Sequence, residues 1–185
     1  MISIRPIQPD TAALLDQIDN RYTARETVSA QYDDAGFTLA YAPLPKPVQR
    51  TYPPGGVFTA QELLRRKDAE CFFAWADDKP VGQAVVATHW TKLAMLYDIR
   101  VDESARGAGV GRALIDACVR WAKEQGLKGL IAETQAQNPS ACRFYQHIGF
   151  VLGGVDRLLY AAIPRPPASA REPLDYALFF YLLFS

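Results

Sequence analysis

The chain alternates short apolar runs with stretches of helical periodicity, and this pattern predicts a mixed α/β protein. Strand-like runs cover Ile2 to Ile7, Phe37 to Ala42, Cys71 to Trp75, Val81 to His89, Met95 to Val101, Gly129 to Gln135, Phe150 to Gly153, Leu158 to Ile163 and Tyr176 to Phe184. Helical runs cover Thr11 to Asn20, Arg21 to Tyr32 (the weakest), Thr59 to Lys67, Arg112 to Glu124 and Pro139 to Ile148. The turn Asp77-Asp78-Lys79-Pro80 predicts a hairpin. Proline-rich segments, Pro43 to Pro54 and Pro164 to Pro173, predict loop or extended chain.

A glycine-rich turn, Arg106-Gly107-Ala108-Gly109-Val110-Gly111, joins the run Met95 to Val101 to the helix Arg112 to Glu124. Strand, glycine turn and helix in this order can aim several backbone N–H groups at one anion, and the helix dipole adds to the attraction. The order therefore predicts a phosphate or pyrophosphate site. The spacing is not the Rossmann G-x-G-x-x-G, and the G-K-[ST] of a Walker loop is absent. The alternative is a plain tight turn.

A second motif runs from Asn138 to Phe150 and reads Asn-Pro-Ser-Ala-Cys-Arg-Phe-Tyr-Gln-His-Ile-Gly-Phe. Asn138 is suited to cap a short helix with Pro139 at its first position, and Gly149 to end it. Ala141, Phe144, Tyr145 and Ile148 would share one face of that helix. The alternative for Tyr145 alone is an ordinary core tyrosine.

The two motifs together resemble the signature segments of the GNAT superfamily of N-acetyltransferases: R-x-x-G-x-G at Arg106, Gly109 and Gly111, and N-x-x-A-x-x-x-Y-x-x-x-G-F from Asn138. This resemblance implies one α/β domain over residues 1–185. It would hold a single mixed, mostly antiparallel sheet with helices on both faces. Its central parallel strands, Met95 to Val101 and Gly129 to Gln135, would splay apart to admit acetyl-CoA.

The resemblance also implies which residues bind acetyl-CoA, the co-substrate. The backbone of Ile99, Arg100 and Val101 would hold the pantetheine arm, and Asn138 and Tyr145 would lie beside the arm and the thioester sulfur. The loop would wrap the pyrophosphate with its segment Arg106, Gly107, Ala108, Gly109, Val110, Gly111 and Arg112.

In the implied reaction a primary amine attacks the thioester directly, so no protein nucleophile is needed. Tyr145 would protonate the leaving thiolate. Asp98 and Glu133 interrupt apolar strand runs, which makes each a candidate base or amine anchor. The alternative for each is an ordinary solvent-facing strand residue.

A narrower resemblance is to the streptothricin acetyltransferases. It rests on Tyr97 to Asp102, Glu133-Thr134-Gln135, Asn138 with Ser140-Ala141-Cys142, Trp121-Ala122-Lys123 and the aromatic end Ala177 to Leu182. It implies a cationic small-molecule amine as acceptor. Alternatives are another small amine, an aminoglycoside-like acceptor, a protein amine, or a non-catalytic domain that senses acyl-CoA. A pure interaction domain is disfavoured because both motifs match.

Composition adds mainly exclusions. Lys and Arg number 20, as do Asp and Glu, so nothing in the overall charge favours a nucleic acid or a membrane surface. Cys71, Cys118 and Cys142 lack metal-ligand spacing, and with only two histidines we expect no metal site. The chain shows neither a signal-peptide pattern nor a membrane-spanning run, which predicts a cytoplasmic protein. The apolar last strand hints at a homodimer, although internal packing would also explain it.

Overall fold

The computed structural model describes residues 1–52, 56–161, 163 and 175–185. The chain divides into two compact units. The first comprises Met1–Tyr22, Thr51–Ile131 and Leu183–Ser185, and the second comprises Thr23–Arg50 and Ala132–Leu182.

The first unit is built mainly from four strands and two α-helices. Its elements are β1 (Ile2–Pro6), the 3-10 turn η1 (Ala12–Leu14), α1 (Ala60–Arg65), β4 (Ala69–Ala76), β5 (Lys79–Thr88), β6 (Ala94–Val101), the 3-10 turn η2 (Glu103–Ala105) and α2 (Val110–Glu124). The second unit contains β2 (Tyr22–Asp33), β3 (Gly36–Arg50), α3 (Pro139–Ile148), β8 (Val151–Asp156) and β9 (Ala177–Leu183), apart from single end residues. Strand β7 (Gly129–Gln135) runs through both units.

The hydrogen-bonded strand order is β1-β4-β5-β6-β7-β9-β8 in a seven-stranded sheet, and β2 and β3 form a separate two-stranded sheet. The large sheet is mostly antiparallel with one parallel pair. The strands β1, β4, β5 and β6 pair antiparallel in sequence, so the hairpin expected around Asp77-Asp78 is confirmed. The mixed α/β sheet with helices agrees with the expected fold class.

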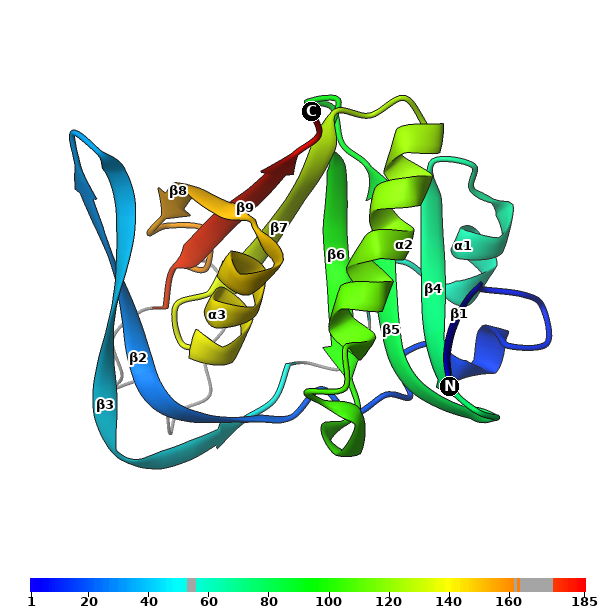
Figure 1. Ribbon diagram of the computed structural model, residues 1–185, viewed down its shortest axis with the longest axis horizontal. Coiled ribbons are helices and arrows are strands. Elements are labelled where there is room, and N and C mark those ends of the chain that lie inside the picture. Colours follow the sequence, from blue (N-terminus) through cyan, green and yellow to red (C-terminus); the bar gives the residue numbers. More distant parts are fainter. Residues whose placement is uncertain (53–55, 162, 164–174) are drawn as a thin grey trace. The chain divides into compact units, whose positions relative to one another are not determined.

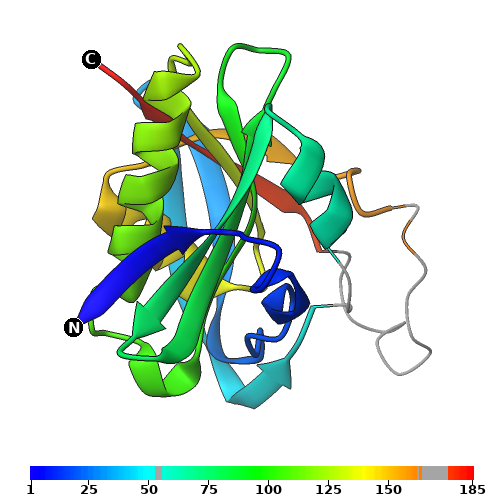
Figure 2. The same ribbon diagram turned by 90° about the vertical axis from the view of Figure 1, so that its right-hand side faces the viewer.

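In the first unit, helices cover both faces of the sheet (Figures 1 and 2). Helix α1 begins at Thr59, whose side chain and Glu62 form a capping box, and it buries Leu63 against Cys71, Phe73 and Val85. Helix α2 packs on β4, β5 and β6 with an apolar stripe. The buried residues of that stripe are Val110, Leu114, Ile115, Ala117, Cys118, Trp121 and Ala122.

The helix expected over Thr11 to Asn20 is wrong: only Ala12–Leu14 forms a 3-10 turn. The chain then becomes extended at Leu15, and Asp16 adopts a positive φ of 63°. Asp16 accepts a hydrogen bond from the Gly56 N–H (3.1 Å), and its own N–H donates to Gln83 Oε1 (3.0 Å). These long-range contacts stabilise a turn that the local periodicity does not reveal.

The helix expected over Arg21 to Tyr32 is also wrong, because this segment is strand β2. Tyr22, Ala24 and Val28 are buried while their immediate neighbours are more exposed, which is the two-residue period of a strand. Its partner β3 continues through Pro43, Pro45 and Pro47. Prolines two positions apart remove N–H donors from one edge of a strand only, so the other edge can still pair.

The strand expected over Leu158 to Ile163 is wrong for the described residues, which form bends and turns. The Asp156 carboxylate accepts hydrogen bonds from the N–H groups of Leu158 (2.8 Å) and Leu159 (3.0 Å), which turns the chain out of β8. The proline-rich segment Pro164 to Pro173 lies outside the described residues. The last strand is confirmed as β9, and Leu178 and Phe180 on it are fully buried within the single chain.

Candidate functional site

The glycine loop follows β6 in the first unit and is held by side-chain contacts. The Asp102 carboxylate accepts from the Ser104 N–H (3.0 Å) and caps η2. The Arg106 guanidinium donates to two main-chain carbonyls, those of Val101 (3.0 Å) and Arg21 (2.7 Å). Arg106 therefore anchors the loop with its side chain.

The loop leads to an open helix end. Gly109 is the N-cap of α2 with φ 82°, and no side chain caps the helix. The Ala113 N–H donates to Gly109 O (3.0 Å), which forms the first hydrogen bond of the helix, and backbone N–H groups at a helix start point outward along its axis. A Cβ added at Gly107 or Gly109 would meet nothing within 4 Å. The space beside this backbone and the positive helix end suit a pyrophosphate.

Strand β6 carries a β-bulge at the residue that precedes Asp98. Val85 of β5 is opposite Asp98 and Val86 is opposite Leu96, so Tyr97 is the extra residue. The ring of Tyr97 meets Phe58 edge-on, with 5.2 Å between centroids. Ile99, Arg100 and Val101 pair with Ala84, Gln83 and Gly82. Their contact with a pantetheine arm stays a prediction.

Asp98 lies in a hydrogen-bonded network rather than on an open strand face. Arg100 Nε donates to Asp98 Oδ1 (3.1 Å) and Oδ2 (2.9 Å), and Gln83 Nε2 donates to Oδ2 (2.6 Å). The second partner of Arg100 is Asp16, at 2.9 Å. Burial raises the pKa of the Asp98 carboxyl, and Arg100 opposes that rise. Asp98 is thus a restrained carboxylate that exposes 21% of its side chain.

In the second unit, Glu133 on β7 accepts a hydrogen bond from the Tyr160 hydroxyl. Burial raises the pKa of Glu133, Tyr160 lowers it, and the charge of Asp175 raises it further. A carboxyl of this kind is easier to protonate than an exposed glutamate, which is a property of groups that exchange protons in active sites. Glu133 is therefore partly buried and partnered, not an ordinary solvent-facing residue.

The second motif folds as its residues predict. Asn138 Oδ1 accepts from the Ala141 N–H (3.0 Å), Pro139 is the first residue of α3, and Gly149 ends it with φ 109°. Tyr145 is 4% exposed. Its ring packs against Phe150 and Phe180 at centroid distances of 5.3 and 5.4 Å, which fixes its direction.

Three residues of these networks were not expected from the sequence: Asp16, Gln83 and Tyr160. Gln83 is fully buried within the apolar run Val81 to His89, so the argument applied to Asp98 could have found it. Asp16 was assigned to a helix that does not form, and Tyr160 to a strand that does not form. No local pattern marks either residue.

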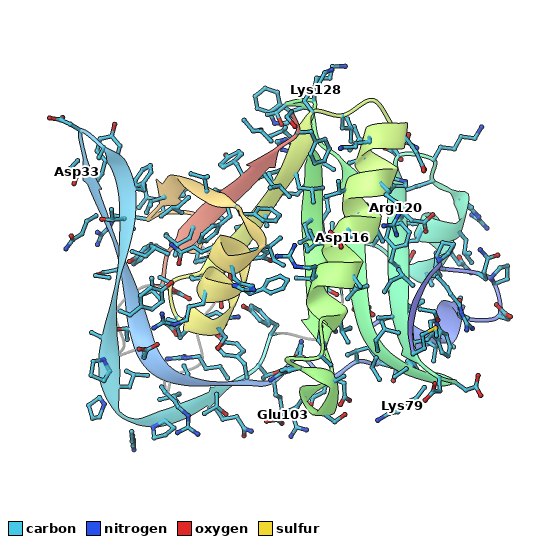
Figure 3. The ribbon with its side chains drawn as sticks, in the orientation of Figure 1. Asp33, Lys79, Glu103, Asp116, Arg120 and Lys128 are labelled. Carbon is cyan, nitrogen blue, oxygen red and sulfur yellow. The ribbon has the colours of Figure 1, made fainter. Side chains whose placement is uncertain are left out.

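The cysteines are free and buried, and burial raises the pKa of Cys118 and of Cys142 to about 12. In the described part of the chain, no group of three or more His, Cys, Asp or Glu side chains could hold a metal ion. Nor does any described helix have the length and apolar character needed to cross a membrane. Figure 3 shows the charged ends of Asp116, Arg120, Lys79 and Glu103 around α2 and the nearby loops.

The chain is similar to known acetyltransferases. Residues 34–150 match the model of the acetyltransferase (GNAT) family. The chain is 32% identical over 164 residues to streptothricin acetyltransferase of Escherichia coli, covering 89% of this chain and 88% of that protein. It is 36% identical over 113 residues to streptothricin acetyltransferase A of Bacillus subtilis strain 168, covering 61% of each.

The fold is also similar to a solved structure that carries the donor. It is a protein assigned as streptothricin acetyltransferase from Bacillus anthracis strain Ames, in complex with acetyl coenzyme A. The TM-score is 0.87 with 25% sequence identity, and the match covers 100% of both chains. The chain belongs to the GNAT family of acetyltransferases, enzymes that use acetyl-CoA as the acetyl donor.

Proposed function

We propose that this enzyme acetylates streptothricin on its β-lysine amine and thereby inactivates the antibiotic. The observation that carries the proposal is the similarity to the Escherichia coli streptothricin acetyltransferase along nearly the whole length of both chains. The proposal is further supported by Asp98 and Glu133, because carboxylates suit a cationic acceptor.

Acetyl-CoA supplies the activated acetyl group. The fit is supported by the uncapped first turn of α2 and the open space beside Gly107 and Gly109. In this proposal, the N–H groups of Gly109 to Arg112 receive the pyrophosphate, and the backbone of Ile99 to Val101 holds the pantetheine arm. Arg106 keeps the loop in shape through its two main-chain contacts.

The chemical roles are divided among three side chains. Asp98 holds the acceptor's ammonium group, and Asp98 or Glu133 takes up the proton that the amine must lose. Tyr145 gives a proton to the sulfur as the thioester bond breaks. The ammonium loses two protons: one goes to the carboxylate before the attack, and the second, released as the amide forms, replaces the proton that Tyr145 gives to the sulfur. The products are an amide, a free thiol and one proton held by the protein.

The test is the release of thiol from acetyl-CoA with a panel of acceptors: streptothricin, aminoglycosides, polyamines, lysine and short peptides. We expect selective turnover of streptothricin and a product heavier by one acetyl group. Selective turnover of another amine would identify a different acceptor for the same acetyl-transfer reaction. Tight acetyl-CoA binding without turnover of any amine would favour an acyl-CoA sensor.

A further inference from the structure

Asp16 is linked to Asp98 by two shared partners within the first unit. Gln83 Nε2 donates to Asp16 Oδ1 (3.2 Å) and to Asp98 Oδ2 (2.6 Å). The same terminal nitrogen of Arg100 lies 2.9 Å from Asp16 Oδ1 and 3.0 Å from Asp98 Oδ1. Gln83 is fully buried and the Arg100 side chain is 11% exposed, so neither donor can turn to bulk water as an alternative partner.

Asp16 is itself held in an unusual backbone conformation. Its φ of 63° is uncommon for a residue with a side chain and persists only when the surroundings enforce it. Here the enforcing contacts are the Asp16 N–H to Gln83 Oε1 (3.0 Å) and the Gly56 N–H to Asp16 Oδ2 (3.1 Å). The backbone N–H and the carboxylate of Asp16 are thus both held by hydrogen bonds.

The charges of the network are unequal, because two carboxylates share one guanidinium. The titratable or charged groups that act on Asp98 are Arg100 on β6, Asp16 after η1 and the Cys71 thiol on β4. Arg100 lowers the pKa of Asp98, and the negative charge of Asp16 raises it. Burial raises the pKa of Cys71 well above its usual range, so that thiol stays neutral. Arg100 is the shared positive charge for which the two carboxylates compete.

We propose that Asp16 is a positioning residue for Asp98. It shares the hydrogen bonds of Arg100 and Gln83 with Asp98, so Arg100 offsets the negative charge of Asp98 only in part, and Asp98 can bind the acceptor's ammonium. The kinetic part of this inference rests on the proposed function, whereas the link between the two carboxylates does not. Without Asp16, Arg100 would pair with Asp98 alone, and its positive charge would offset the charge that Asp98 offers to an ammonium group.

The test that needs no acceptor follows the carboxyl carbons of the ¹³C-labelled protein by NMR as pH changes. In the parent protein we expect the Asp98 carboxyl to titrate at higher pH than in the variant without the Asp16 charge, because that charge raises the pKa of Asp98. In Asp16→Asn we expect a single titration of Asp98, shifted to lower pH. Asp10→Asn, an exposed aspartate of the same segment, should leave the Asp98 curve unchanged.

Kinetics then separate positioning from simple structural support. We expect Asp16→Asn to lower kcat/KM for the amine about tenfold, mainly through its KM, with the KM for acetyl-CoA unchanged. The acid limb of the pH profile should move to lower pH. An Asp98 titration that is unchanged in Asp16→Asn would overturn the proposal. If no amine is turned over by the parent, the proposed function fails, and the NMR titration still decides whether Asp16 controls Asp98.

Discussion

Arg100 holds both carboxylate oxygens of Asp98, its neighbour two positions earlier on the same strand. Residues two apart on a strand point to one face, so β6 itself places the cation beside the acid. The bulge at Tyr97 shifts the register just before this pair. The carboxylate is restrained before any substrate arrives, which reduces the reorganisation needed to bind a cationic amine.

Replacing Asp98 by asparagine tests its role in acceptor binding. Asp98→Asn keeps the shape but removes the charge, so we expect kcat/KM for the amine to fall about 100-fold, within the range for a lost acid–base group. The dissociation constant of acetyl-CoA, measured by calorimetry, should not change. Asp78→Asn in the exposed hairpin turn is the matched control. Full activity in Asp98→Asn would remove Asp98 from the mechanism.

The glycine loop can be tested with two glycines at opposite ends of α2. Gly109 and Gly126 have similar positive φ values of 82° and 71°, so alanine at either position strains the backbone by about 1–2 kcal/mol. We expect both variants to lose comparable stability in thermal unfolding. Only Gly109→Ala should weaken acetyl-CoA binding, because its methyl group would enter the space beside the loop. Equal affinities in the two variants would argue against a pyrophosphate site at Gly109.

Tyr145→Phe tests whether the Tyr145 hydroxyl protonates the leaving thiolate. The ring is packed against Phe150 and Phe180, so the variant should fold and bind acetyl-CoA as the parent does. Turnover should fall about 100-fold, which is typical of a lost general acid. Single-turnover kinetics with saturating acetyl-CoA would measure the chemical step directly. An unchanged rate would leave Tyr145 with a packing role only.

The sequence predicted the local structure of the glycine turn and of α3, which depends on neighbouring residues. The turn between β6 and α2 needs glycine at positive φ, and α3 needs Asn138 and Gly149 at its two ends; both signals are local. The network around Asp98 depends on Asp16 and Gln83, which are 67 residues apart. Its geometry comes from a turn fixed by distant contacts, and such contacts leave no periodic pattern. The same reason explains why Tyr160 was assigned to a strand.

Glu133 should make stability depend on pH. Its pKa is raised in the folded protein, so the folded state binds the proton more tightly than the unfolded state. The parent should therefore lose stability as pH rises from the ordinary pKa of glutamate through the raised one. The glutamine of Glu133→Gln cannot ionise. The unfolding free energy of this variant minus that of the parent, both measured in urea, should therefore increase as pH rises across that window. A difference that stays constant or shrinks with pH would show that the pKa is not raised.

The packing of β8 on β9 offers a stability test with an internal control. A Cβ at Gly153 would lie 2.7 Å from the Tyr181 ring, whereas one at Gly154 would lie at an ordinary 3.6 Å from Phe179. Gly153 is also the extra residue of the bulge between these strands. We expect Gly153→Ala to cost about 1–3 kcal/mol of unfolding free energy, as overpacking does, and Gly154→Ala to cost much less. Similar melting temperatures would contradict this register.

The most direct test of the whole account is kcat/KM for acetyl transfer by the purified enzyme to streptothricin, compared with each other amine at the same acetyl-CoA concentration. The account predicts that streptothricin is preferred over every other acceptor by about 100-fold or more, a margin of roughly 2.8 kcal/mol in transition-state binding. The product should carry one acetyl group on the β-lysine amine. Equal or faster turnover of another amine, or no acetylation of streptothricin, would contradict the proposed substrate.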